Sequence, residues 1–265
     1  MYEVITSLQN PQVKIWRSLN RSRSARVEAG LFLAEGEHMA GEALKQQKAR
    51  ALLIDQRALD KYGALAENPR GASVYVLAGH VMEALSDAKS PQGVIAVCAY
   101  PAPAAPCGRL IAALDGVQDP GNVGTVIRTL DAAGFSCLLT DEKTADPYGP
   151  KALRASMGGV FRVPCVQCPS LPDTLEALKN SGFDILAGDL RGEDFFSRRK
   201  TKDKVCIVIG SEGQGISPAV MEKATLRLRL PIPGGAESLN AAVAAGIMIY
   251  DVLREKTSGS YPFRP

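Results

Sequence analysis

Residues 119–128, DPGNVGTVIR, predict a glycine-containing loop that turns into an amphipathic helix. Asn122 is a favoured N-cap, apolar residues follow at helical spacing, and Gly134 provides a C-terminal stop. Gly124 and Arg128 lie four residues apart, so we expect them to share a helix face with an open notch beside the guanidinium. Such a notch could hold a phosphate or a sugar. The alternative is an ordinary helix with a solvated arginine.

The composition is that of a globular protein large enough for two hydrophobic cores. The chain has 265 residues, of which 46% are hydrophobic and 22% are charged. No apolar run is long enough to cross a bilayer, and the N-terminus lacks the pattern of a charged segment followed by an apolar leader. We therefore expect a cytoplasmic protein.

The cysteines do not predict a disulfide scaffold or a metal site. The six are Cys98, Cys107, Cys137, Cys165, Cys168 and Cys206. They are too scattered for a disulfide framework, and one C-x-x-C pair in a chain with two histidines makes a poor zinc site. We interpret them as structural thiols and expect no metal.

Positive charge is concentrated near the N-terminus. Within residues 1–30, five basic side chains face two acidic ones, a surplus equal to the net charge of +3 of the whole chain. The basic residues are Lys14, Arg17, Arg21, Arg23 and Arg26. Trp16 lies among them, where it either stacks on a base or anchors the segment. The pattern is compatible with nucleic-acid binding and equally with a solvated basic helix.

A proline-rich stretch divides the chain. Residues 99–108 contain three prolines within six positions, which favours a stiff, extended linker. We expect an N-terminal domain over residues 1–98, a C-terminal domain over 109–257 and a flexible tail over 258–265. In the N-terminal domain, strands are predicted at 31–34, 51–54, 74–77 and 94–97, and helices at 37–47 and 80–85.

The C-terminal domain predicts a parallel α/β sheet. Strands are expected at 110–114, 137–140, 185–187, 205–209 and 226–230, and helices at 123–133, 173–180, 218–224 and 239–255. Residues 205–209 are apolar at every position, as expected of a parallel strand covered on both faces. Ligands bind at the carboxyl ends of such strands. The site is therefore expected in the loops after Leu114, Thr140, Ile209 and Leu230.

Two further loops have the composition of binding loops. Residues 210–217 imitate a phosphate-binding loop, but Ile216 replaces its lysine and Glu212 adds a negative charge, so the loop suits a neutral or cationic ligand better. Because its glycine spacing does not match the dinucleotide fingerprint, a nucleotide-dependent oxidoreductase is disfavoured. Residues 230–240 contain two prolines and two glycines, and Ser238 or Asn240 can cap the helix that follows. The alternative for residues 210–217 is a tight turn, and the alternative for residues 230–240 is a purely structural loop.

Together these motifs resemble those of the SpoU (TrmH-type) RNA ribose methyltransferases of the SPOUT superfamily. The resemblance rests on Asn122, Gly124 and Arg128, on residues 210–217 and on residues 230–245, in the order and spacing of the three family motifs. A segment between the first two motifs, with Lys151, Ala155, Ser156 and Gly158, is also similar. The N-terminal part resembles the substrate-binding domain, itself similar to a ribosomal RNA-binding protein, that is fused to many of these enzymes.

The resemblance implies a trefoil-knotted C-terminal domain, S-adenosylmethionine as the cofactor and a homodimer formed through this domain. General rules of chain connection would not predict a knot. By position, the implied cofactor residues are Thr140, Gly210, Leu230, Ile232 and Leu239. The implied reaction is methyl transfer to a ribose 2′-hydroxyl of structured RNA, with ribosomal RNA as first choice.

The family points to Arg128 as the residue that acts on the hydroxyl. Because arginine stays charged and is a poor base, we expect it to grip a phosphate and stabilise the developing alkoxide. The residues expected to orient the ribose, Arg128 and the cofactor are Asn122, Glu212, Ser238 and Asn240. The expected RNA contacts are Lys14, Arg17, Arg21, Arg23, Lys151 and Arg154. Alternative functions are transfer RNA methylation, an antibiotic-resistance methylation of ribosomal RNA and non-catalytic RNA binding.

Overall fold

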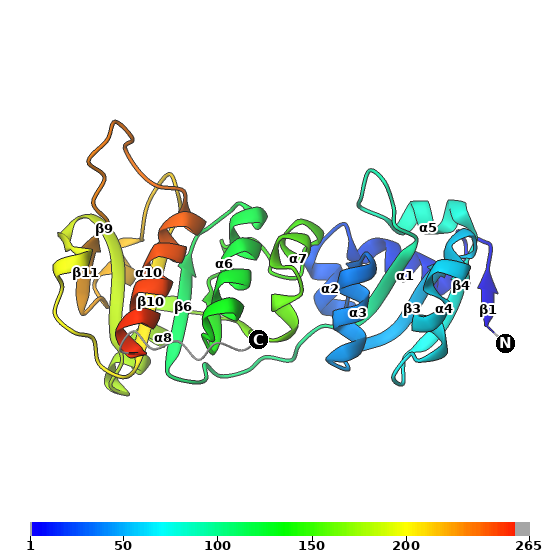
Figure 1. Cartoon of the computed structure of the whole chain (residues 1–265), viewed down its shortest axis with the longest axis horizontal. Helices are drawn as coiled ribbons and strands as arrows, with labels where there is room; N and C mark the ends of the chain where they lie inside the picture. Colours follow the sequence, from blue (N-terminus) through cyan, green and yellow to red (C-terminus); the bar gives the residue numbers. More distant parts are fainter. Residues whose placement is uncertain (1, 258–265) are drawn as a thin grey trace. The chain divides into compact units, whose positions relative to one another are not determined.

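The computed structural model describes residues 2–257 and divides into two compact units. The first unit comprises the residues up to 102 together with 146–162, and the second comprises 103–145 and the residues from 163 onward (Figure 1). The expected tail, 258–265, lies outside the described residues. Within the described range, no helix has the length and apolar character needed to span a membrane.

The first unit is an α/β domain built on a mixed five-stranded sheet. Its strands are β1 (Glu3–Ile5), β2 (Leu31–Glu35), β3 (Ala49–Asp55), β4 (Ser73–Leu77) and β5 (Val94–Ala99), in the order β1-β4-β3-β5-β2. Its helices are α1 (Pro11–Leu19), α2 (Arg23–Ala29), α3 (Glu37–Lys45), α4 (Leu59–Glu67), α5 (Gly79–Leu85) and α7 (Pro150–Ser156), with short turns η1 (Gln56–Ala58) and η2 (Gly159–Phe161). β4 runs parallel to β1 and β3, whereas β5 runs antiparallel to β2 and β3.

Residues 146–162 join the first unit through a buried ion pair and an aromatic cluster, although the sequence places them inside the expected C-terminal domain. The Arg26 guanidinium lies 2.6 Å from the Asp146 carboxylate, and both side chains are less than a tenth exposed. Beside this pair, aromatic rings from the two segments pack on one another; they are Phe32, Tyr100, Tyr148 and Phe161. A paired buried charge is costly to separate, so the segment is firmly attached.

The second unit contains a six-stranded, entirely parallel sheet. Its strands are β6 (Leu110–Asp115), β7 (Cys137–Thr140), β8 (Cys165–Gln167), β9 (Asp184–Asp194), β10 (Val205–Gly210) and β11 (Leu226–Arg229), in the order β11-β9-β10-β6-β7-β8. Its helices are α6 (Pro120–Ala133), α8 (Leu171–Asn180), α9 (Pro218–Met221) and α10 (Ala241–Lys256), with one short turn, η3 (Phe195–Ser197). The predicted α/β class with a parallel sheet is confirmed.

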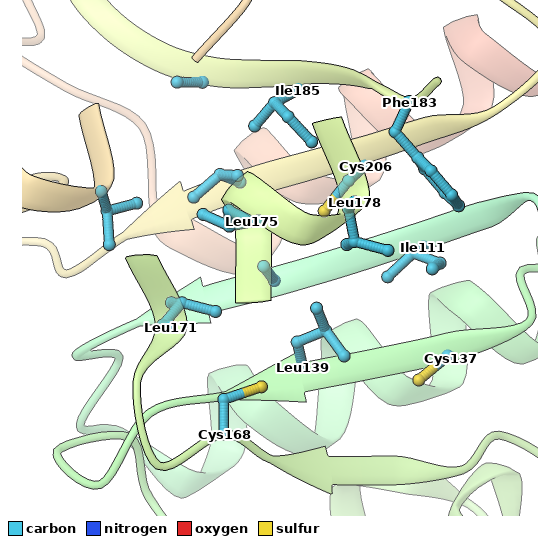
Figure 2. Close-up of a cluster of buried hydrophobic side chains, with 14 of the residues drawn as sticks. Ile111, Cys137, Leu139, Cys168, Leu171, Leu175, Leu178, Phe183, Ile185 and Cys206 are labelled. Atoms are coloured by element: carbon cyan, nitrogen blue, oxygen red, sulfur yellow. The ribbon is translucent and has the colours of Figure 1, made fainter. Parts of the chain in front are cut away.

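The sheet of the second unit is covered by helices, as the apolar run of β10 predicted. On one face, α8 packs Leu171, Leu175 and Leu178 onto the strands (Figure 2). α10 packs against α6 and against β10. Three thiols lie in the core of Figure 2, and burial raises the pKa of the Cys137 thiol to about 12. These cysteines are therefore unreactive packing residues.

Several elements differ from the predictions. The sequence patterns missed β1, β8, α1, α2, α4 and α7, and they placed the ends of most other elements within two or three residues. The largest difference is in β9, which extends to Asp194. β11 pairs with residues 186–187 and again with 193–194 of β9, so the five residues 188–192 have no partner in β11 and form a bulge. Gly192 is required beside this bulge, since a Cβ there would lie 2.5 Å from the Arg227 backbone.

Candidate functional site

A cavity of about 710 Å³ lies in the second unit beyond the carboxyl ends of β9, β10 and β11. It is lined by the β9 bulge, by residues 209–216 at the end of β10 and after it, by 218, 221 and 222 at α9, by 227–230, 232, 238 and 239 around the next loop, and by α10. Its volume is within the range of small-molecule sites, and its position matches the rule for open α/β sheets. The loops predicted after Ile209 and Leu230 therefore do meet at one cavity.

The loop after β10 is held in a fixed, tight form. Ser211 and Gly215 exchange two backbone hydrogen bonds, and Gly215 has a φ of +68°, in the left-handed region that favours glycine. A Cβ on Gly210 would lie 2.2 Å from the Gly215 carbonyl carbon, so only glycine fits there. At the end of the loop, the Asp115 carboxylate accepts a hydrogen bond of 2.6 Å from the Ser217 N–H.

The loop before α10 offers its backbone to the cavity. In the described structure, residues 231–239 make no backbone–backbone hydrogen bond, although Ile232, Ser238 and Leu239 line the cavity. Backbone N–H and C=O groups that the fold does not use can hydrogen-bond a bound ligand. Four of the five predicted cofactor residues line the cavity: Gly210, Leu230, Ile232 and Leu239. The fifth, Thr140, does not; it is buried at the end of β7.

Three predicted catalytic residues from separate loops form one hydrogen-bonded chain. Asn240 donates from Nδ2 to Oδ1 of Asn122 at 3.0 Å, and Asn122 donates from its own Nδ2 to the Glu212 carboxylate. Asn240 is itself fixed, because its Oδ1 accepts from the N–H groups of Ala242 and Val243 as the N-cap of α10. Glu212 lines the cavity, so the chain connects the cavity wall to the starts of α6 and α10.

The predicted N-cap of the first motif is wrong. α6 begins at Pro120, and the Asp119 carboxylate caps it by accepting from the N–H groups of Gly121 and Asn122. Asn122 lies inside the first turn, and its side chain is available for Glu212 and Asn240. The predicted open notch is also wrong, since Gly124 is buried. Gly134 does end the helix, in the left-handed conformation with a φ of +70°.

Arg128 and Ser238 are exposed and are not joined to this chain. Arg128 lies on α6 outside the cavity lining, and in the described structure its guanidinium makes no hydrogen bond or ion pair. Ser238 lines the cavity, and its hydroxyl has no hydrogen-bond partner in the described part of the protein. Both side chains are therefore available to a ligand.

The six predicted RNA contacts all belong to the first unit. The residues are Lys14 and Arg17 on α1, Arg21 and Arg23 at α2, and Lys151 and Arg154 on α7. All are exposed except Arg23, which is partly exposed, and Arg154 pairs with Asp87 at 2.8 Å.

Two neighbouring residues are removed from this basic surface. Arg26 is buried against Asp146 and also donates to the Leu19 carbonyl. Trp16 is 5% exposed and packs edge-on against Tyr75, so it anchors α1 and is not available to stack on a base. Of the two alternatives for Trp16, the structure therefore selects anchoring.

Sequence reasoning missed two parts of the site. Asp115, the last residue of β6, pairs in register with Gly210 and braces the neighbouring loop. A carboxylate directly after an apolar strand was the available signal. The β9 bulge contributes Gly188, Asp189, Leu190 and Arg191 to the cavity, and nothing in the local pattern predicts that these residues leave the strand register.

Comparison with known proteins gives matches over both parts of the chain. Residues 109–250 match the model of the SpoU rRNA Methylase family, and residues 10–96 match that of an MRM3-like substrate binding domain. The chain is 34% identical over 247 residues to the 23S rRNA (guanosine(2553)-2′-O)-methyltransferase RlmP of Bacillus subtilis. This alignment covers 93% of this chain and 97% of that relative.

Solved structures agree with the sequence matches. The SpoU methyltransferase AviRb of Streptomyces viridochromogenes, in complex with the cofactor AdoMet, is 31% identical with a TM-score of 0.86, covering 95% of this chain and 100% of AviRb. An AdoMet-bound rRNA methyltransferase from Sinorhizobium meliloti is 31% identical with a TM-score of 0.82, covering 97% of this chain and 98% of that one.

Proposed function

Because the chain belongs to the SpoU rRNA Methylase family, we propose that it methylates a ribose 2′-hydroxyl of large-subunit ribosomal RNA. The protein is an RNA methyltransferase, and its methyl donor is S-adenosylmethionine. The observation that carries the choice of substrate is the alignment, over nearly the whole length of both chains, with an enzyme named for 2′-O-methylation of 23S rRNA. The transfer RNA and antibiotic-resistance alternatives are not favoured by any feature of the site.

The cavity fits this cofactor. Four of the five residues expected to hold it line the cavity, where backbone groups that make no hydrogen bond within the described structure can bind an adenosine. Bound there, the cofactor supplies an electrophilic methyl group on a sulfonium. Glu212 places a carboxylate in the lining, which suits a ligand that bears a positive charge, whereas the Asp189 carboxylate lies 3.7 Å from the Arg191 guanidinium in the same wall.

The hydrogen-bonded chain supports a division of labour among the catalytic residues. Asn240 and Asn122 fix the Glu212 carboxylate at the cavity wall, where it can orient the ribose or the cofactor. Arg128, which has no protein partner in the described structure, can bind the RNA phosphate and stabilise negative charge on the attacking oxygen. Ser238 can hydrogen-bond either reactant. Alignment of two reactants contributes roughly 7–11 kcal/mol to such reactions.

The first unit is proposed to bind the RNA that carries the target ribose. The match to a substrate binding domain supports this role, as do the exposed basic residues on α1, α2 and α7. Contacts of this type supply affinity and position, and they carry no sequence information. Residues 1–98, followed by the linker 99–108, are the proposed substrate-binding domain, and residues 109–257 are the proposed catalytic domain, of which 146–162 pack with the first unit.

A homodimer through the catalytic domain is part of the proposal, as is the knot implied by the family. Val243, Ile247 and Tyr250 are spaced at i, i+4 and i+7 on α10 and are 36–52% exposed. Such an apolar helix stripe favours a protein partner. An Ile247→Glu variant is expected to run as a monomer in size-exclusion chromatography with light scattering; an unchanged mass would exclude this interface.

The function is tested by mapping ribose methylation in ribosomal RNA from cells that lack the protein. One unmodified ribose should appear in 23S rRNA, and the purified protein with S-adenosylmethionine should restore it. A 2′-deoxy substitution at that nucleotide should abolish product, because the acceptor oxygen is then missing. Calorimetric titration with the cofactor separates the enzyme from a non-catalytic RNA-binding protein, which would release no heat of binding.

A further inference from the structure

Basic side chains gather at the amino-terminal edge of the parallel sheet, opposite the cavity. β6, β9 and β10 begin at one level, because Val205 pairs in register with both Leu110 and Asp184. The residues just before these strands therefore lie together. The exposed basic side chains among them, which we call the basic edge, are Arg109, Arg199, Lys200, Lys202 and Lys204. The length of β10 separates this edge from the cavity by roughly 17 Å, at about 3.3 Å per residue.

The segment that carries most of the basic edge, residues 198–204, is fixed by ion pairs. The Arg198 side chain is 4% exposed and binds Asp251 at 2.7 Å and Glu255 at 3.0 Å, both on α10. Next to it, Arg199 makes two hydrogen bonds of 2.8 Å to the buried Asp184 carboxylate. These contacts tie the segment to α10 and to the start of β9.

The outward-facing charge of this edge is strongly positive. Asp184 is fully buried and is shared by Arg199 and, at 3.9 Å, by Lys202. Within residues 198–204, Asp203 is the exposed carboxylate. In the described structure, Arg109 and Lys200 have no acidic partner. Pairing with Asp184 accounts for Arg199 and Lys202, and Lys204 donates to the Ser181 carbonyl, but no such contact in the described structure accounts for Arg109 and Lys200.

We propose that the basic edge binds phosphates of a second segment of the RNA substrate, remote from the methylated ribose. This inference rests on the proposed function, which makes structured RNA the substrate. Lysine-rich, exposed sites suit phosphates better than base edges, because the ammonium group acts as a point charge without fixed hydrogen-bond geometry. A folded RNA with separate helices can reach both edges of the sheet, whereas a short stem–loop at the cavity cannot.

The test compares a variant that replaces basic residues of the edge by acidic ones with a variant that replaces an acidic residue of the same segment by a basic one. The triple variant Arg109→Glu/Lys200→Glu/Lys204→Glu leaves Arg199 and Lys202 in contact with Asp184. Its KM for a full-length 23S rRNA transcript should rise at least tenfold, with kcat and the Kd for S-adenosylmethionine unchanged. The slope of log Kd against log salt should fall by about two units for three lost phosphate contacts. For a short stem–loop that contains the target nucleotide, KM should not change.

Two controls keep the outcome decisive. Asp203→Lys should shift rRNA affinity and salt dependence in the opposite direction, which a damaged fold would not do. The Lys200 side chain makes no hydrogen bond or ion pair in the described structure. Lys200→Glu alone should therefore reproduce about a third of the change in the slope of log Kd against log salt. An unchanged KM and slope would overturn the proposal. A loss seen with ribosomal particles but not with free rRNA would overturn it too, because the partner would then be a protein.

Direct binding of the variants to the transcript, measured by filter retention, is independent of turnover. If the wild-type protein bound 23S rRNA through the basic edge but methylated no ribose in it, the proposed function would fail and this inference would stand. If the wild-type protein methylated 23S rRNA but the variants bound the transcript as tightly as wild type, the proposed function would stand and this inference would fail.

Discussion

Replacement of Asn122 by alanine tests whether the three loops act as one catalytic unit. The substitution removes both side-chain hydrogen bonds that connect Asn240 to Glu212. Asn122 does not line the cavity, so the cofactor lining stays complete. We therefore expect a loss of kcat with almost no change in cofactor affinity.

The magnitude follows from the kind of bond that is lost. A hydrogen bond to a charged group contributes about 1.5–3 kcal/mol. If that energy is used to position Glu212 in the transition state, Asn122→Ala should lower kcat by about 10- to 150-fold, since roughly 1.36 kcal/mol corresponds to a tenfold change in rate. Glu212→Gln should show a similar loss. If Asn122 acts through Glu212, the double variant should be little worse than the poorer single variant.

The assay measures transfer of tritiated methyl groups to 23S rRNA under saturating conditions, together with calorimetric titration of S-adenosylmethionine. Thr125→Ala, on the exposed side of the same helix, serves as the matched control, because the Thr125 hydroxyl donates to the Gly121 carbonyl and not to the catalytic chain. If the fold losses in kcat of Asn122→Ala and Glu212→Gln multiply in the double variant, the coupling between these two residues is refuted. So would a tenfold weaker Kd for the cofactor in Asn122→Ala, because the residue would then act on the pocket and not on catalysis.

Arg128, Gly210 and Asp184 each give a further prediction. Arg128→Lys should lower kcat by about 10²–10³ while the cofactor Kd stays within threefold, because the guanidinium lies outside the cavity lining; near-normal methylation would contradict the assignment. Gly210→Ala should weaken cofactor binding at least a hundredfold in calorimetry, because its Cβ would lie 2.2 Å from the Gly215 carbonyl carbon; binding within threefold of wild type would show that the loop accommodates the methyl group. Burial raises the pKa of Asp184, but hydrogen bonds from Arg199 and from the Lys202 backbone lower it more, so the net shift is downward. The stabilisation is therefore complete above the unfolded value of about 3.9 and is lost as pH falls through the lower folded value. In urea unfolding, the stability difference between wild type and Asp184→Asn should be constant near neutral pH and shrink below about pH 4, and a difference independent of pH would contradict the sign of the shift.

The parallel sheet could be predicted because its strands are buried on both faces. Val205–Ile209 has no polar residue. In an α/β protein, such a run is typical of a parallel strand that is buried on both faces. Three loops at strand ends could be found for the same reason, since glycine and proline mark where strands stop. The short strand β8 was missed because it has only three residues, Cys165–Gln167, between Pro164 and Pro169.

The helix start of the first motif was misjudged because two nearby residues are both good caps. Asp119 and Asn122 can each accept from backbone N–H groups, and proline at the first helical position favours the earlier start. The difference matters for function. With Asp119 as the cap, the Asn122 side chain is released from the backbone and can connect Glu212 to Asn240.

The place of residues 146–162 could not be predicted, because it depends on contacts between residues far apart in the chain. Arg26 and Tyr100 pair with Asp146 across separations of 120 and 46 residues, and no local pattern records such a pair. Two basic residues of this segment, Lys151 and Arg154, are thereby grouped with the basic helices α1 and α2. A segment encoded between two catalytic motifs thus belongs, in space, to the unit proposed to bind the substrate.

The brace at Asp115 shows why a loop of this composition can serve catalysis. Residues 211–217 contain two glycines and would be flexible in isolation, yet Glu212 must be held to be useful. The loop is fixed at its start by the close approach of Gly210 to Gly215, at its end by the hydrogen bond from Ser217 to Asp115, and in its middle by Asn122. Because Asp115 and Gly210 are paired neighbours in the sheet, the rigid strands set the position of the carboxylate. The fold thus restrains the loop that carries Glu212, as its proposed role in catalysis requires, whereas Arg128 is exposed on α6.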